Sequence, residues 1–451
     1  MHFLIVIKKI YIIQLNLVTF ILNLLCDEKT CYNRCGDNMT KIKTWISNHK
    51  IIIILFLLSF IMRIGVILLV DTPVISDFKT MLDASQELIK NTTAYKSMPY
   101  FITWGYQMGH VIYQAILLSI INSTTFLKVV NSIITSLTVV MIYLIGKELS
   151  NTKAATIISL IYSVFLFPLL LNTVLTNQLL PMVLILIAIY LWIKQKKSTK
   201  HIPIIIGVLL GLSNIFRSET IVIIIAFFLY SIFLIMKKEN KKKVIISFLL
   251  IITSYIAVTL GTSYLLKATN ISPSGLENKN PSWKFLEGLN VKTNGRYSEE
   301  DARRYAYNKE KTDKVLKKRI KKDYQNYPVL FLKKIKITWL NSDLSWSLGH
   351  LKNEEQIKYY EAINQFFIYF FFIMTLLSSI TLFKKIYTHP QILITLILCI
   401  YCGVYLFIEV MPRYAYSLQI FEAILASITL GYILDNKKED KVGAKNGKTR
   451  K

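Results

Sequence analysis

Charged residues are scarce in this chain. Asp, Glu, Lys and Arg make up 18% of its 451 residues, whereas hydrophobic residues make up 53%. Soluble globular domains carry about 25% charged residues, so the composition excludes an ordinary water-soluble fold. The hydrophobic residues come in blocks of about 17 to 25, the length that a helix needs to cross a hydrocarbon core about 30 Å thick. The composition therefore predicts an integral membrane protein.

Short segments of alternating apolar and polar residues, from which membrane β-barrels are built, are also missing. Residues 51–70 and 244–266 are instead apolar on every face of the segment. The predicted fold class is an all-α polytopic membrane protein, a bundle of about ten transmembrane helices. The spans are expected at residues 51–70, 126–146, 153–171, 177–194, 202–216, 219–236, 244–266, 363–383, 390–408 and 412–434.

Acidic residues are half as frequent as basic ones, 27 against 54. The basic residues gather in short segments between the spans, whereas residues 172–176 contain none. The positive-inside rule therefore places both termini in the cytoplasm of a multi-pass plasma-membrane protein. Because topology and anionic inner-leaflet lipid account for much of the basic excess, nucleic acid is not an expected partner. The basic segments are 146–153, 194–201, 237–243, 384–389 and the tail 436–451.

Cysteine and histidine are rare, with five and six residues. Cys26, Cys31 and Cys35 are spaced too loosely for a metal site, and His110 and His350 stand alone. Neither a metal nor a cofactor is therefore expected.

Residues 1–38 admit two interpretations. The apolar segment 3–25 resembles a signal sequence or an extra membrane segment. Alternatively, Met39 begins a basic and then apolar stretch of the kind found at a natural start, which makes the upstream residues an over-long gene prediction. We favour the second interpretation.

Two of the expected outward segments are too long to be simple connectors. In the first, 71–125, residues 78–90 (FKTMLDASQELIK) place apolar side chains on one face and predict an amphipathic surface helix. Residues 99–121 form either a second surface helix or a segment that dips into the membrane. The second, 267–361, is predicted to be a small external subdomain with a helical middle. Its lysine run is either a solvated face or an electrostatic funnel for a phosphate-bearing lipid or polymer. The transmembrane regions are then residues 39–266 and 362–435.

Ionisable side chains stand at the outer ends of spans, where charge is costly and a functional site is the default hypothesis. A carboxylate there can take a proton from an acceptor hydroxyl, and arginine can bind phosphate bidentately. The alternative is that these side chains pair with one another or reach the lipid headgroups. They are Asp77 after the first span, Arg217 and Glu219 in 214–219 (NIFRSE), and Glu409, Arg413 and Tyr414 in 409–414 (EVMPRY).

Several motifs resemble those of the GT-C glycosyltransferases. Within that superfamily the chain resembles the bacterial dolichyl-phosphate-mannose protein mannosyltransferase-like group, glycosyltransferase family 39, over most of residues 45–435. The similarity is most specific at 409–414. The other similar segments are 76–78 (SDF), 142–147 (IYLIGK), 167–168 (FP) and 207–217 (GVLLGLSNIFR).

The resemblance implies an inverting transfer of a sugar from a polyprenyl-phosphate donor to an acceptor hydroxyl on the outer face of the membrane. The acceptor is a cell-envelope glycan, a lipid or a protein. Asp77 would be the catalytic base, and Arg217 and Arg413 would hold the donor phosphate. Glu219 and Glu409 would orient these arginines, with Tyr414 in a supporting role. The scheme needs no nucleotide sugar and no metal.

The chain departs from the family pattern at two places. Members often have an acidic residue after the third span, where Asn177 or Gln178 stands here. Some have an adjacent Asp-Glu pair in the first loop, whereas Phe78 follows Asp77. The acceptor therefore stays open.

A transporter or lipid flippase is the alternative function. Such proteins place ionisable groups near the bilayer midplane, often in repeated halves with broken helices. This chain shows no internal repeat, and its candidate residues gather at one face. A glycosyltransferase is therefore favoured. A non-catalytic membrane scaffold would be indicated if Asp77 could be replaced without effect.

Overall fold

The computed structural model describes residues 38–195, 201–351 and 353–448. The predictions for the N-terminal segment, including Cys26, Cys31 and Cys35, lie outside these residues. The chain divides into two compact units, Met1–Ile54 and Leu55–Lys451. The second contains every candidate site residue.

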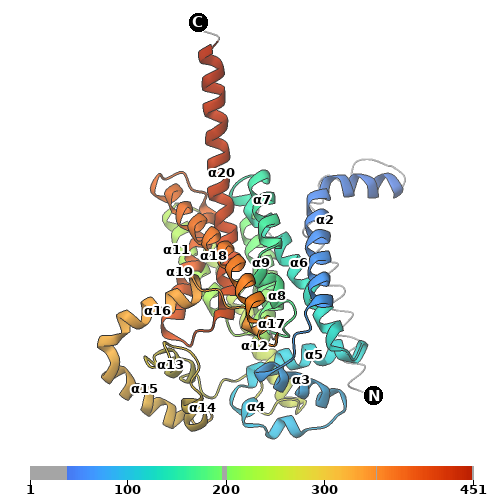
Figure 1. Cartoon of the computed structure of the whole chain (residues 1–451), viewed down its shortest axis with the longest axis vertical. Helices are drawn as coiled ribbons and strands as arrows, with labels where there is room; N and C mark the ends of the chain where they lie inside the picture. Colours follow the sequence, from blue (N-terminus) through green and yellow to red (C-terminus); the bar gives the residue numbers. More distant parts are fainter. Residues whose placement is uncertain (1–37, 196–200, 352, 449–451) are drawn as a thin grey trace. The chain divides into compact units, whose positions relative to one another are not determined.

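Helices occupy all the positions where spans were predicted (Figure 1). Six of the described helices are long and apolar enough to cross a membrane, and α9, α10 and α11 are shorter apolar helices. The predicted all-α polytopic class is thereby confirmed. The helices are α2 (Asn38–Leu69), α6 (Thr124–Leu149), α7 (Thr152–Ser163), α8 (Leu166–Leu171), α9 (Leu179–Lys194), α10 (His201–Phe216), α11 (Thr220–Met236), α12 (Lys241–Ala268), α18 (Glu354–Phe383), α19 (His389–Phe407) and α20 (Ala415–Lys448).

The third predicted span, 153–171, is not one continuous helix, since α7 ends at Ser163 and α8 begins at Leu166. Pro168 explains the break, because it has no N–H and its ring would clash with the carbonyl of Val164, four residues earlier. The backbone N–H of Phe167 donates to the side-chain oxygen of Asn364 in α18, at 2.9 Å. A neighbouring helix thus satisfies one amide left free at the start of α8.

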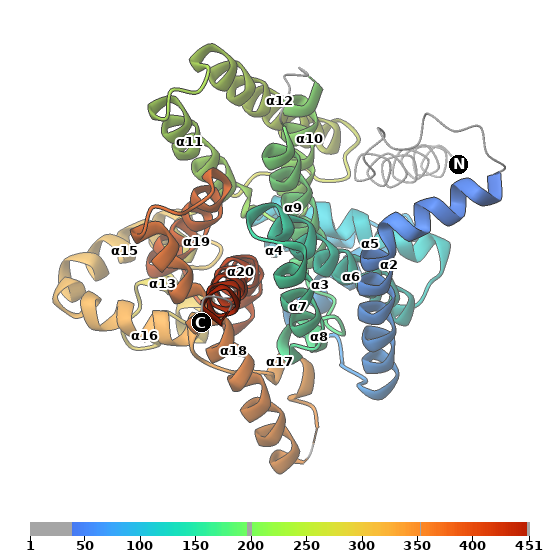
Figure 2. The ribbon, with the colours of Figure 1, turned by 90° about the horizontal axis from the view of Figure 1, so that it is seen from above.

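Burial separates the inner helices of the bundle from the outer ones. The most apolar stretches of α6 and α20 are 78% buried, whereas those of α2 and α12 are 17% buried. In Figure 2, α20 lies among α7, α18 and α19, with which it also packs. Small residues allow close approach between helices. A Cβ added at Gly207 of α10 would lie 2.3 Å from the carbonyl oxygen of Ile251 in α12.

The first long loop, residues 71–125, folds into short helices at one end of the bundle, which we call the loop end (Figure 1). The predicted amphipathic helix is confirmed as α3, which buries Phe78, Met81 and Leu82 among other residues. Residues 99–121 do not form a single helix. The elements are α3 (Ser76–Ile89), η2 (Ala94–Ser97), α4 (Pro99–Thr103), η3 (Gly105–Gln107) and α5 (Met108–Ile120).

The second long segment also lies at the loop end and has the helical middle that was predicted. A small apolar cluster of Trp283, Leu286 and Ala306 holds it together. Exposed ion pairs one turn apart occur on its helices, for example Lys309 with Asp313 at 2.7 Å. The elements are α13 (Trp283–Gly288), α14 (Glu299–Tyr305), α15 (Lys309–Asp323), η4 (Tyr324–Asn326), α16 (Tyr327–Trp339) and α17 (Ser345–Leu348), and the short η5 (Pro412–Tyr414) precedes α20.

Candidate active site

Asp77 lies in the first turn of α3, with its side chain exposed. The helix N-terminus favours a negative charge at this position. Within the described residues its carboxylate makes no hydrogen bond or ion pair. Ser76, immediately before it, has a φ of 55°, a left-handed conformation that non-glycine residues adopt rarely and often at functional sites. Asp77 is thus placed by a constrained backbone and keeps its carboxylate available.

Arg217 lies in the turn between α10 and α11, and its donors are engaged. Its Nε donates to Glu219, and its Nη1 donates to the side-chain oxygen of Asn177 at 2.9 Å. Glu219 also accepts from the hydroxyl of Ser417 at 3.2 Å. The amide of Asn177 therefore provides an acceptor at the position where the family resemblance led us to expect a carboxylate. The predicted pairing of Arg217 with Glu219 is present in the structure.

Arg413, in η5, is held by aromatic rings. Its guanidinium carbon lies 4.2 Å from the ring centroid of Trp346, 4.8 Å from that of Phe78 and 5.8 Å from that of Tyr414. The side chain is 7% exposed, yet Nε and Nη1 have no hydrogen-bond partner among the described residues. Leaving charged donors buried and unpaired is costly. An anion bound at this position would satisfy them.

Glu409 was expected to pair with Arg413. In the structure it pairs instead with Lys284 of α13. Glu409 is 1% exposed, so its charge needs a close partner. Burial lowers the pKa of Lys284, but the charge of Glu409 and its hydrogen bond, together with Tyr414 and Tyr106, raise the pKa above its usual value. The expected orientation of Arg413 by Glu409 is replaced by this ion pair, because α13 packs directly on the backbone around Glu409.

Residues 408–410 make close backbone contacts with α13 and with the segment that follows it. The N–H of Glu409 donates to the carbonyl of Lys284 at 2.7 Å, and that of Val410 donates to the carbonyl of Gly295 at 2.9 Å. A Cβ added at Gly288 would lie 2.2 Å from the carbonyl carbon of Ile408, so only glycine fits. The external subdomain therefore fixes the turn that leads to Arg413.

Lys334 of α16 strengthens the same junction. Its Nζ donates to the carbonyls of Gly288 at 2.8 Å and of Leu406 and Ile408 at 2.7 Å each. Burial lowers the pKa of Lys334 to about 7, and the charge of Glu409 acts in the opposite direction. Three acceptors require three N–H groups, so this geometry is that of an ammonium ion.

Tyr106 of η3 is affected by several of the charged groups described above. Burial raises the pKa of its hydroxyl, and the charges of Lys284, Arg217 and Asp77 all act on it. Charged side chains from three other segments thus lie within electrostatic range of Tyr106. Sequence reasoning assigned no role in the site to Tyr106, Lys284 or Trp346.

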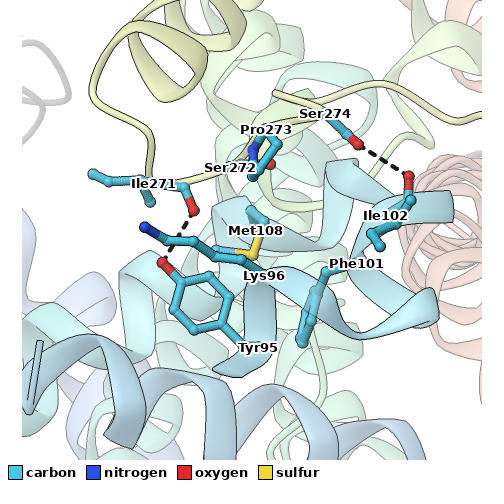
Figure 3. A pocket seen from close by; sticks show the side chains of 9 residues that line it. All are labelled: Tyr95, Lys96, Phe101, Ile102, Met108, Ile271, Ser272, Pro273 and Ser274. Carbon is cyan, nitrogen blue, oxygen red and sulfur yellow. Dashed lines mark hydrogen bonds between the residues drawn. The ribbon is translucent and has the colours of Figure 1, made fainter. Parts of the chain in front are cut away.

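A small pocket lies between the first loop and residues 271–274 (Figure 3). Its volume of about 10 Å³ is room for about one water molecule. The hydroxyl of Tyr95 donates to the carbonyl of Ile271, and that of Ser274 donates to the carbonyl of Ile102, both at 3.0 Å. The pocket therefore lies at a packing contact between the two long segments and is too small for a sugar.

Comparisons with known proteins agree with this architecture. Residues 108–261 match the family model described as dolichyl-phosphate-mannose-protein mannosyltransferase. The matched range contains Arg217 and Glu219. A search of curated proteins gave no match.

Among solved structures, the chain is similar to the oligosaccharyltransferase of Archaeoglobus fulgidus. The form tethered with an acceptor peptide containing the NVT sequon matches with a TM-score of 0.54 at 12% identity, over 87% of this chain and 50% of that chain. The apo form matches with a TM-score of 0.52 at 12% identity, over 85% and 51%. The chain thus spans about half the length of these structures.

The fold defines the class, a multi-pass, all-α membrane protein whose fold resembles that of the GT-C oligosaccharyltransferase. Within that class, the predicted resemblance to the dolichyl-phosphate-mannose protein mannosyltransferase group is confirmed by the match over residues 108–261.

Proposed function

We propose that the protein transfers a sugar from a polyprenyl-phosphate-linked donor to an acceptor hydroxyl. The observation that carries the proposal is the pair of buried, unpartnered donors of Arg413 next to an available carboxylate. Phe78, which contacts the guanidinium, directly follows Asp77 in α3. A base and an anion-binding group therefore meet in one small region, as transfer from a lipid phosphate requires.

In the proposed mechanism, the Asp77 carboxylate takes the proton of the acceptor hydroxyl as its oxygen attacks the anomeric carbon. The bond from that carbon to the phosphate oxygen breaks, and the lipid phosphate leaves with the bonding electrons. Arg413 donates hydrogen bonds to the phosphate and neutralises the charge that grows on it. Arg217 acts nearby, through Glu219 and Asn177, and supports the ring of Tyr414, whose centroid is 5.3 Å from its guanidinium carbon.

The loop end is proposed to face the outside of the plasma membrane, with both termini in the cytoplasm. The support is the distribution of basic residues, since the short segments at the opposite end of the bundle are lysine-rich. Donor and acceptor would then meet at the outer leaflet. The acceptor is a cell-envelope glycan, a lipid or a protein.

A transporter would need exposed or unpaired charge inside the bundle, where Arg63 of α2 and Glu422 of α20 are buried. The Nε of Arg63 donates to Thr135 at 2.8 Å and its Nη1 to the carbonyl of Ser59 at 3.2 Å, contacts that fit a structural role. Oε1 of Glu422 has no hydrogen-bond partner among the described residues, so Glu422 is the residue that a transporter would use. The glycosyltransferase proposal is preferred because Asp77, Arg217 and Arg413 all lie at the loop end.

The test is sugar transfer in proteoliposomes supplied with a panel of polyprenyl-phosphate sugars radiolabelled in the sugar. Asp77→Asn should lower kcat by about 10² to 10⁴, the usual contribution of a general base. Asp83→Asn is the matched control, because Asp83 is an exposed carboxylate on the same helix that pairs with Lys79. Equal activity of wild type and Asp77→Asn would remove Asp77 from the mechanism. Absence of transfer by the wild type with every donor would favour the transporter.

A further inference from the structure

The turn from α15 into α16 exposes apolar side chains that nothing in the described chain covers. Ile320 and Tyr324 are 42% and 60% exposed, and Val329 and Leu332 are 56% and 68% exposed. Apolar side chains gathered on a surface in this way mark a contact with another apolar phase. We call residues 320–336 the α15–α16 elbow.

The elbow lies at the depth where a membrane-spanning helix ends. The ring centroid of Phe331 is 5.3 Å from that of Phe407, the last residue of α19. Lys334 reaches the carbonyls of Leu406 and Ile408 at the same helix end. Figure 1 likewise shows α16 beside the loop end of α19. Since spanning helices end at the headgroup boundary, α16 lies at that boundary as well.

One face of α16 has the pattern of an interfacial helix. Val329, Leu332, Lys333 and Lys336 are spaced at i, i+3, i+4 and i+7, so they share one face. All four are exposed, whereas Leu330 on another face is 1% exposed and packs inward. Apolar side chains with neighbouring lysines allow insertion into the acyl boundary while the ammonium groups stay among the headgroups.

The lysines of the elbow have no acidic partners. Lys321, Lys322, Lys333 and Lys336 are exposed and make no ion pair within the described residues. At the start of α15, by contrast, Lys309 pairs with Asp313. Anionic headgroups attract such a cluster at a membrane surface.

We propose that the α15–α16 elbow inserts into the membrane surface at the loop end and binds anionic lipid headgroups through these lysines. The membrane would then hold the external subdomain by its edge. The same subdomain carries Lys284 and Gly288, which fix the turn at Glu409. Lipid composition would therefore act on the candidate site through α13.

The experiment places an environment-sensitive fluorophore at single cysteines, after replacement of the native cysteines by serine. Leu332→Cys and Val329→Cys report on the elbow, and Glu310→Cys, exposed at the start of α15, is the matched control. The protein is reconstituted in phosphatidylcholine with or without phosphatidylglycerol, together with lipids spin-labelled near the headgroup. Quenching at positions 332 and 329 should exceed that at 310 several-fold and should increase with phosphatidylglycerol. Replacing Lys321, Lys322, Lys333 and Lys336 by Gln should remove that increase.

Equal quenching at positions 332, 329 and 310 would overturn the insertion. The binding of anionic headgroups would be overturned if quenching did not increase with phosphatidylglycerol. It would also be overturned if the Gln variant still showed that increase. If a soluble polyphosphate shields the label and lipid does not, the partner of the elbow is an anionic polymer and not the membrane. The readout requires no sugar transfer, so its outcome is independent of the proposed function.

Discussion

Two turns at the loop end each present an arginine, and the protein holds the two side chains in opposite ways. Arg217 has its Nε and Nη1 engaged by Glu219 and Asn177. Arg413 is held by the faces of aromatic rings such as Trp346, and its Nε and Nη1 have no partner among the described residues. A guanidinium held by its faces keeps its edge donors for a ligand. We therefore expect Arg413 to bind the ligand and Arg217 to maintain the shape of the site.

The largest effect on activity is expected from Arg413→Met, which tests whether Arg413 is the arginine that binds the ligand. Removing preorganised donors for the leaving phosphate should lower kcat/KM for transfer by about 10² to 10³. Thermal stability should stay equal or rise, because methionine fits among the rings and removes a buried charge without hydrogen-bond partners. Transfer assays and thermal unfolding in detergent measure the two effects. Activity within a few-fold of wild type would show that Arg413 does not hold the phosphate.

Arg217→Met should have the opposite pattern, with a larger loss of stability and a smaller loss of activity. The substitution leaves Glu219, largely buried, without its cation, and the free energy of unfolding should fall by about 3 kcal/mol. Its effect on kcat/KM, measured below the lowered unfolding midpoint, should be smaller than that of Arg413→Met. The double variant Arg217→Met/Glu219→Leu should regain much of the stability. If the double variant is as unstable as the single one, the ion pair is not the source of the loss.

A smaller effect is expected from Lys284→Met, which acts on the Arg413 turn from the external subdomain. Glu409 would remain buried without a partner, and the turn would be less firmly held. The donor KM should rise by about tenfold with a lesser change in kcat, because binding geometry is lost before the chemistry. Lys279→Met, at an exposed lysine nearby, is the control and should leave KM unchanged. A decrease in kcat with an unchanged donor KM would instead indicate that Lys284 acts in the chemical step.

Taken per pH unit, the smallest effect concerns Glu287 of α13, on whose carboxyl the charge of Glu409 acts. Burial raises the pKa of Glu287 to about 8, so the folded state retains a proton that the unfolded state loses near its ordinary pKa. Stability of the external subdomain is then full at low pH and decreases as pH rises to about 8, by at most about 1.4 kcal/mol per pH unit. Trp283, buried in the same helix, reports its unfolding by fluorescence. Glu287→Gln should flatten this profile, and an unchanged slope would assign it to another group.

Local patterns in the sequence predicted the features that depend on neighbouring residues. Span positions and the helix at 78–90 follow from apolar length and spacing, and both are confirmed. Pro168 contained the information for the break between α7 and α8, but the apolar run around it favoured one helix. The presence of arginines at two span ends was also evident from position alone.

Long-range partners were beyond such patterns. Glu409 pairs with Lys284, 125 residues away, and nothing in either segment specifies the other. The expected partner Arg413 was chosen because it is close in sequence. Similarly, Trp346 stacks on Arg413 from the external subdomain, a contact that depends on how that subdomain folds back onto the bundle. Ion pairing and stacking across a fold are set by tertiary packing, which sequence spacing does not encode.

The stacking of Trp346 on Arg413 also gives the protein an intrinsic optical reporter. The indole lies 4.2 Å from the guanidinium carbon, measured to its ring centroid, so its emission responds to the charge beside it. A phosphate that neutralises Arg413 changes that charge. With six tryptophans in the chain, the difference between the wild type and Trp346→Phe isolates this one signal. Donor occupancy thus becomes visible by fluorescence titration, even in a variant that transfers no sugar.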